Sequence, residues 1–216
     1  MVYSKNELTA LAEVLLKHPH LLIVSDDIYE HILWTHRPFF NIPRVCPELQ
    51  ARTLVINGVS KAYSMTGWRI GYAAGPKELI AAMKKVQSQS TSNPCSIAQR
   101  AAQAAIMGDQ ECVHEMVKEF KTRHDYVVQA LSNMEGINIL PSSGTFYSFP
   151  DVSEAIRQMP GINNDLEFSE HLLVKAGVAV VPGSAFGSEG CIRISFATSM
   201  EKLHDAMKRI KTVING

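Results

Sequence analysis

The sequence lacks several features that would mark particular classes of protein. Lys and Arg together number 21, as do Asp and Glu, so no net charge draws the chain to nucleic acid or to an anionic membrane. No uncharged apolar run reaches the roughly 18 residues that a membrane-spanning helix needs. The first residues lack the basic region and apolar core of a signal peptide. Any anion that binds must therefore be held by a few placed side chains.

Cysteine is scarce and scattered. The four cysteines show none of the close pairings typical of zinc sites, and their spacing does not suggest a secreted disulfide framework: Cys46, Cys95, Cys112 and Cys191. We predict no metal site, and we expect a reducing, cytoplasmic environment. The four side chains are expected to be small buried or half-buried residues.

The residues that are present indicate a globular chain of strand–helix units. Hydrophobic residues make up 46% of the chain and charged residues 19%, enough for a real core. Ser4 and Glu7 form a capping box that predicts a helix almost at once. Continuous apolar runs at 21–26 and 53–57 predict buried strands of a parallel sheet covered by helices on both faces, and 69–74 predicts a third strand.

The second half of the sequence has a different pattern. Helices are predicted over 77–89, 96–107 and 110–134, the last one ending with Gly136 as its C-cap. Beyond it, short strands are predicted at 137–140, 145–149, 178–181 and 191–196, with helices at 168–176 and 199–213. This order predicts an α/β region over 1–112 and an α+β region over 113–216, with a boundary inside the long helix.

The segment 57–72 carries the chemistry that the sequence shows best. Lys61 leaves a buried strand beside the hydroxyl of Ser60 and shortly before Arg69. Desolvation and a nearby cation both favour a neutral, nucleophilic amine, so this lysine suits a Schiff base. Ser60 and Arg69 could hold a phosphate. Judged by spacing alone, a solvated lysine on a surface loop remains the commoner interpretation.

The same segment resembles the lysine signature of class I pyridoxal-phosphate-dependent aminotransferases of the aspartate aminotransferase type. It reads Asn-Gly-Val-Ser-Lys-Ala-Tyr-Ser-Met-Thr-Gly-Trp-Arg-Ile-Gly-Tyr, and it departs from the family pattern at Gly58, where a hydroxyl residue is usual. The resemblance implies a fold-type I transferase, with Lys61 as the catalytic lysine that binds pyridoxal 5'-phosphate and moves the substrate's proton. It implies that Ser60 and Arg69 hold the cofactor phosphate.

Two further motifs fit this resemblance. Asp26 and Tyr29, after the first predicted strand, resemble the family's Asp-Glu-x-Tyr segment. By that resemblance Asp26 pairs with the pyridine nitrogen and Tyr29 hydrogen-bonds the ring hydroxyl oxygen. A carboxylate there keeps the nitrogen protonated, so the ring accepts electrons. Arg193 matches the family's arginine for the substrate α-carboxylate, although a structural ion pair is the alternative for a buried arginine.

The resemblance also implies that relatives are longer at the N-terminal side. On that interpretation 1–112 is the C-terminal part of the cofactor-binding large domain, with only a remnant of its sheet, and 113–216 is the small domain. Exposed strand edges and uncovered apolar helix faces would follow. We expect the isolated chain to aggregate, to associate with another copy, or to bind cofactor weakly.

The resemblance predicts a homodimeric transaminase that acts on an amino acid, with aspartate or glutamate as the best candidates, and on a 2-oxo acid. It predicts no nucleic-acid or membrane partner. The same Lys61, Asp26 and Arg69 also serve β-lyases and cyclopropane-forming synthases of this fold, so those activities stay open. A non-catalytic module of the same fold is the alternative from a different class.

Overall fold

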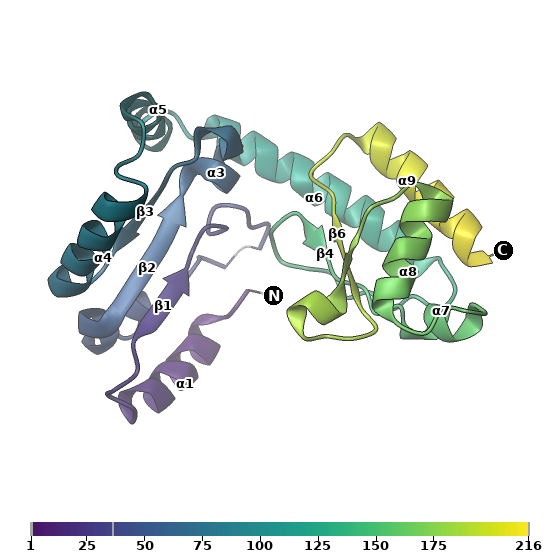
Figure 1. The fold of residues 1–216 in the computed structure, drawn as a ribbon, viewed down its shortest axis with the longest axis horizontal. Coiled ribbons are helices and arrows are strands. Elements are labelled where there is room, and N and C mark those ends of the chain that lie inside the picture. Colours follow the sequence, from purple (N-terminus) through teal and green to yellow (C-terminus); the bar gives the residue numbers. More distant parts are fainter. Residues whose placement is uncertain (1, 36, 216) are drawn as a thin grey trace. The chain divides into compact units, whose positions relative to one another are not determined.

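The chain folds into two compact units. The computed structural model describes residues 2–35 and 37–215. The units are Met1–Val117 and Lys118–Gly216, and the division falls inside one long helix, α6 (Glu111–Ser132) (Figure 1). Our sequence boundary near residue 112 lies in the same helix. The assignment of the two units to a large and a small domain stays a prediction.

The first unit is built on a three-stranded sheet. Figure 1 shows β2 (Thr53–Gly58) between β1 (Ile23–Asp26) and β3 (Gly71–Ala74). The first two strands pair in parallel, with Asp26 opposite Ile56, whereas β3 runs antiparallel to β2. Parallel pairing of β1 with β2 therefore sets the carboxyl ends of both strands at one edge of the sheet.

The third strand begins two residues later than the apolar pattern predicted. Arg69 has φ 52° and ψ 50°, which is the left-handed helical region. A residue in that conformation cannot lie in an extended strand. The strand therefore starts at Gly71, and Arg69 belongs to the turn that precedes it.

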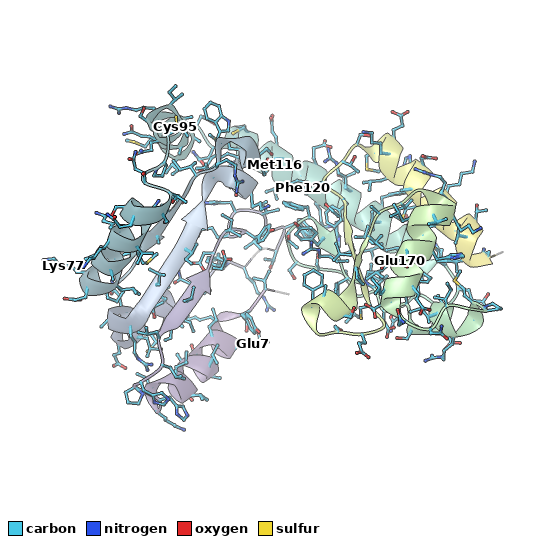
Figure 2. The ribbon with its side chains drawn as sticks, in the orientation of Figure 1. Glu7, Lys77, Cys95, Met116, Phe120 and Glu170 are labelled. Carbon is cyan, nitrogen blue, oxygen red and sulfur yellow. The ribbon has the colours of Figure 1, made fainter. Side chains whose placement is uncertain are left out.

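The N-terminal helix packs into a small apolar cluster. The predicted capping box is present in α1 (Lys5–Leu16): Glu7 N–H donates to Ser4 Oγ at 3.3 Å, and Ser4 N–H donates to a Glu7 carboxylate oxygen at 2.7 Å. Glu7 is labelled in Figure 2. Two short helices that we did not predict, α2 (Ile42–Val45) and η1 (Pro47–Arg52), cover this helix. The buried cluster comprises Leu8, Ala12, Ile42 and Leu49.

The three longer helices follow their predicted positions closely. They are α4 (Lys77–Ser90), α5 (Ser96–Met107) and α6. The predicted end of α6 was wrong, since the helix stops at Ser132 and Gly136 lies four residues beyond as part of a turn with φ 73°. A Cβ at Gly136 would lie 2.6 Å from Ala155 N, so close packing there requires glycine in addition to the left-handed backbone.

The second unit holds a smaller antiparallel sheet. Its strands are β4 (Tyr147–Ser148), β5 (Val181–Pro182) and β6 (Ile192–Ser195), in the order β4-β6-β5. The prediction of a strand at 137–140 was wrong, because that segment pairs at a single point, where Asn138 bridges Asp151. The prediction for 178–181 was also wrong in extent, since β5 begins only at Val181.

Helices and helical turns make up much of the rest of this unit. They are α7 (Ser153–Gln158), α8 (Asp165–His171), the π-helical turn η3 (Leu172–Ala176), the 3-10 turn η4 (Gly183–Phe186) and α9 (Met200–Asn215). The helix predicted at 168–176 starts earlier because Asn164 accepts a hydrogen bond from Glu167 N–H and acts as the N-cap. Fully buried apolar side chains form the core, including Phe168, Leu172, Ile192, Phe196 and Ile210.

The structure bears on two expectations drawn from the whole sequence, one about membrane-spanning helices and one about the burial of the cysteines. In the described part of the chain, no helix is long and apolar enough to cross a membrane. The expectation that all cysteines are buried or half-buried was wrong for two of them. Cys46 and Cys191 are half-buried, but Cys95 and Cys112 are exposed.

Arg52 ties the end of α1 to the start of β1. Its guanidinium donates to His18 O at 2.9 Å, to Leu21 O at 2.7 Å and to Leu15 O. These carbonyls lie at the end of α1 and in the turn that follows, where Leu15 O also accepts from His18 N–H and His18 O from Leu21 N–H, so the guanidinium adds to the turn's own hydrogen bonds. Arg52 therefore fixes the path of the chain into the first strand.

We expect Arg52→Met to lower the free energy of unfolding by about 2 kcal/mol, because hydrogen bonds from a charged donor are lost. Urea unfolding followed by circular dichroism measures the change. Arg100→Met is the matched control, since Arg100 is exposed and, among the described residues, its recorded side-chain hydrogen bond is to Gln103 on its own helix. Equal stability of the two variants would contradict the role given to Arg52.

Asp165 is a buried carboxylate that holds the turn before β6. It accepts hydrogen bonds from Ser184 N–H at 2.7 Å and from Gly190 N–H at 3.5 Å. Burial alone would raise the pKa of Asp165, but the hydrogen bonds from Ser184, from its own backbone and from Gly190 together outweigh it and lower the pKa. The folded state therefore favours the ionised carboxylate.

A group whose pKa is lowered by folding stabilises the protein above its unfolded-state pKa, about 3.9 for Asp, and this contribution is lost as the pH falls. We expect Asp165→Asn to lower the thermal midpoint at pH 7, with a difference from wild type that shrinks below about pH 4. Thermal melts over a pH series measure this. The control is Asp205→Asn, an exposed carboxylate on α9. A difference that stays constant down to acid pH would count against the ionised carboxylate.

Candidate functional site

The connection between β2 and β3 carries most of the predicted residues. It consists of α3 (Val59–Ala62) and the 3-10 turn η2 (Thr66–Trp68). The connection starts and ends at two glycines that face each other across the sheet, Gly58 and Gly71. A Cβ on Gly58 would lie 3.1 Å from Gly71 Cα and 3.1 Å from Ile70 O. The glycine that departs from the family pattern therefore serves a close approach of two strands.

Lys61 lies in the short helix α3, directly after the second strand. Its side chain is half-buried, and its Nζ is 6.0 Å from the centroid of the Tyr29 ring. The next residues anchor this helix: Tyr63 donates its hydroxyl hydrogen to Gln110 Oε1 at 2.8 Å, and burial raises the pKa of that phenol. Ser64 Oγ contacts the sulfur of Met116 at 3.3 Å; Met116 is labelled in Figure 2. The lysine is thus held on a firmly attached turn.

Two non-glycine residues of this connection have a left-handed backbone. Ser64 has φ 53° and Arg69 has φ 52°. Such conformations cost about 1–3 kcal/mol each and persist only when the surrounding structure imposes them. Arg69 is exposed, and its Nη1 donates to Thr66 O at 2.9 Å. That bond orients the guanidinium against its own turn while other N–H groups of the fork remain for an anion.

Asp26 and Tyr29 line a cavity at the carboxyl end of β1. The cavity has a volume of about 380 Å³, and its lining also includes Tyr3, Val24 and Phe40. Asp26 is exposed, and its Oδ1 accepts a hydrogen bond from Ile28 N–H at 3.3 Å. A carboxylate at a cavity wall, presented to solvent, is available to a cationic ligand.

The neighbouring carboxylate, Asp27, has a structural role that we did not predict. It is buried and accepts hydrogen bonds from Ser25 Oγ at 2.7 Å and from Asn41 Nδ2 at 2.7 Å. A second, partly buried contact joins the same turn to β2, where Asn57 Nδ2 donates to Glu30 Oε1 at 2.5 Å. The sequence signal for these roles is weak, because polar residues after a strand are common.

Arg193 belongs to the second unit. It lies on β6, where its neighbours Ile192 and Ile194 are buried while Arg193 is only half-buried. Within residues 2–35 and 37–215, no hydrogen bond or ion pair is recorded for its guanidinium. The structural ion pair that the sequence left open is therefore absent from the described contacts.

The structure thus brings some, but not all, of the predicted site residues together in one unit. Lys61 lies near the Tyr29 ring, and Tyr29 shares its cavity with Asp26. Ser60 is next to Lys61 on α3, and Arg69 follows on the same connection. An amine, an exposed carboxylate, a phenol and a guanidinium at one sheet edge can hold a ligand that carries both cationic and anionic groups. Arg193 stands on a separate unit.

Comparison with known proteins places the chain in a family. A family model described as aminotransferase class I and II matches residues 1–210. The aspartate/prephenate aminotransferase of Nitrosomonas europaea is 53% identical over 219 residues, which cover 99% of this chain and 55% of that protein. The aspartate aminotransferase of Bacillus sp. is 47% identical, covering 97% of this chain and 53% of that protein.

Solved structures of aminotransferases are also similar to this chain. The crystal structure of the aspartate aminotransferase from Rhizobium meliloti matches with a TM-score of 0.94 and 45% identity, covering 99% of this chain and 54% of that one. The aromatic aminotransferase from Pyrococcus horikoshii matches with a TM-score of 0.90 and 36% identity, covering 99% and 56%. The chain spans about half the length of the curated relatives it matches. The predicted fold-type I α/β class is confirmed, and the chain belongs to the class I and II aminotransferase family.

Proposed function

We propose that this chain carries the cofactor-lysine half of a pyridoxal 5'-phosphate-dependent aminotransferase. The proposed reaction moves an amino group from an α-amino acid, with aspartate or glutamate preferred, to a 2-oxo acid. The observation that carries the proposal is the placement of Lys61 Nζ 6.0 Å from the ring of Tyr29, a residue that lines the same cavity as Asp26. Aspartate appears in the names of the matched relatives from Nitrosomonas europaea, Bacillus and Rhizobium meliloti, which supports that choice of substrate.

The residues at the sheet edge fit the chemistry of this cofactor. Bound pyridoxal phosphate supplies an electron sink and a carrier for the amino group. Asp26 presents an exposed carboxylate at the cavity wall and suits the protonated ring nitrogen. Tyr29 suits the ring hydroxyl oxygen. The cavity volume of about 380 Å³ is within the usual range for small-ligand pockets.

Lys61 has two proposed tasks. Its Nζ would hold the cofactor covalently, and the same amine would move a proton to or from the substrate's α-carbon. A short helix fixed by the Tyr63–Gln110 hydrogen bond limits the excursion of that amine. The proposed phosphate ligands are Ser60 and Arg69. Because Arg69 has a left-handed backbone, its guanidinium extends from the turn before β3 and not from the strand itself.

The proposed substrate site includes Arg193, whose guanidinium is half-buried and has no recorded ion pair among the described residues. A bidentate pair with the substrate's α-carboxylate would satisfy it. We also propose, from the family resemblance, that the working enzyme is a cytoplasmic homodimer. Light scattering of the purified protein tests the oligomeric state.

Addition of pyridoxal phosphate to the chain is expected to give a visible absorption band that Lys61→Ala abolishes, because the band requires the covalent bond to Nζ. Absorption spectroscopy with cofactor in excess measures it. Lys77→Ala is the matched control, an exposed lysine at the start of α4 that is labelled in Figure 2.

A wild-type chain without a band would favour the non-catalytic module over the enzyme. Where a band appears, product analysis with aspartate and 2-oxoglutarate separates amino transfer from elimination. Elimination products would favour a β-lyase and contradict the proposed reaction.

The two adjacent carboxylates are expected to behave differently. Asp26→Asn should weaken cofactor binding by roughly tenfold to a hundredfold, the loss of one hydrogen bond to a charged group, with the melting temperature unchanged. Asp27→Asn should lower the melting temperature, because the buried Asp27 carboxylate accepts two partly buried hydrogen bonds. Cofactor titration and thermal melts of both variants measure this. The reverse pattern would show that Asp27, and not Asp26, is the ligand.

A further inference from the structure

Arg193 shares one face of the small sheet with Tyr147. Along β6, Ile192 and Ile194 point into the core, so Arg193 and Ser195 point to the opposite face. Ser195 pairs with Tyr147 on β4, and Arg193 is therefore the diagonal neighbour of that tyrosine. Diagonal pairs in an antiparallel sheet are within reach of aromatic and long side chains.

Two aromatic rings lie against the guanidinium. The distance from Arg193 Cζ to the ring centroid is 4.4 Å for Tyr147 and 4.5 Å for Phe186. We call Tyr147 and Phe186 the ring pair. Phe186 comes from η4, far from Tyr147 in the sequence, so the contact arises only in the folded unit.

The ring pair leaves the hydrogen-bonding edge of Arg193 available. A guanidinium stacks on a ring through its planar face, while its N–H groups point outward in that plane. The rings attract the positive charge without neutralising it. This differs from a carboxylate partner, which would occupy the N–H groups that a ligand carboxylate needs.

Both rings are carried by backbone segments that hydrogen bonds and side-chain packing hold in place. Tyr147 follows Phe146, whose backbone oxygen accepts a hydrogen bond from Phe196 N–H at 2.9 Å and whose ring lies 5.3 Å from that of Phe120. Phe120 is labelled in Figure 2.

The turn that carries Phe186 is held by the Asp165 carboxylate through Ser184 N–H. It also starts at Gly183, where a Cβ would lie 2.2 Å from Ser188 O, so the turn admits no side chain at that point. The ring therefore projects from a turn whose backbone has little freedom.

We propose that Tyr147 and Phe186 are positioning residues that hold the Arg193 guanidinium in one orientation, ready for a substrate carboxylate. Holding an arginine in place before a ligand arrives removes part of the cost of ordering it on binding. The inference rests on the proposed function, because it takes Arg193 as the carboxylate-binding residue. The rings themselves act through Arg193 and need not touch the substrate.

Titration of the 216-residue chain with succinate, followed by NMR, tests the ring pair. We expect Phe186→Leu and Tyr147→Leu each to weaken succinate binding about tenfold, and Arg193→Gln to abolish it. Tyr147→Phe and Phe186→Tyr keep a ring and should bind within about twofold of wild type. The Nε–H resonance of Arg193 should also shift when either ring is removed.

Tyr126→Leu is the control for loss of a half-buried ring in the same unit, because Tyr126 packs on His204. It should bind succinate like wild type. Circular dichroism shows whether each variant is folded.

The proposal for the ring pair is contradicted if folded Phe186→Leu and Tyr147→Leu bind succinate as wild type does, or lose no more affinity than Tyr126→Leu. It is also contradicted if the wild-type chain binds no succinate. The Lys61 absorption band is measured separately. If the absorption band is missing while succinate binds normally, the proposed function is contradicted. If the band is normal while Phe186→Leu and Tyr147→Leu bind succinate as wild type does, only the proposal for the ring pair is contradicted.

Discussion

The parallel pairing of β1 with β2 is the constraint on which the candidate cofactor site depends. It aligns Asp26 with Ile56, so the turn after β1 and the short helix after β2 leave the sheet at the same edge. Tyr29 and Lys61, 32 positions apart in the sequence, are thereby brought together, with Lys61 Nζ 6.0 Å from the Tyr29 ring. A register shift of one residue would turn the side chains of β1 to the other face and separate them.

Partly buried polar contacts then fix the turn and the strand end that carry the candidate residues. Asn57 joins the end of β2 to Glu30, and Asp27 accepts two hydrogen bonds that fix the turn carrying Asp26 and Tyr29. Because buried polar groups are costly when unpaired, each contact restricts the turn to one arrangement. The second unit uses the same device, with Asp165 holding the turn that ends in Phe186.

The sequence predicted the elements whose signals are local. The capping box at Ser4 and the apolar runs that became β1 and β2 carry their own physical cause, so they were found without the fold. The segment 137–140 has a strand pattern but only one bridging partner, and Arg69 has a strand-like neighbourhood but a left-handed backbone. Both outcomes depend on distant residues, which a local pattern does not contain.

The sequence by itself determined the family and the identity of the candidate residues, because Lys61, Asp26, Tyr29 and Arg69 lie in motifs whose order along the chain is distinctive. Only the tertiary structure decided which of two adjacent carboxylates is exposed and which is buried. It also decided that Arg193 lies against two rings and not against a carboxylate. Burial and contact arise from packing between segments far apart in sequence, so composition and spacing leave them undetermined.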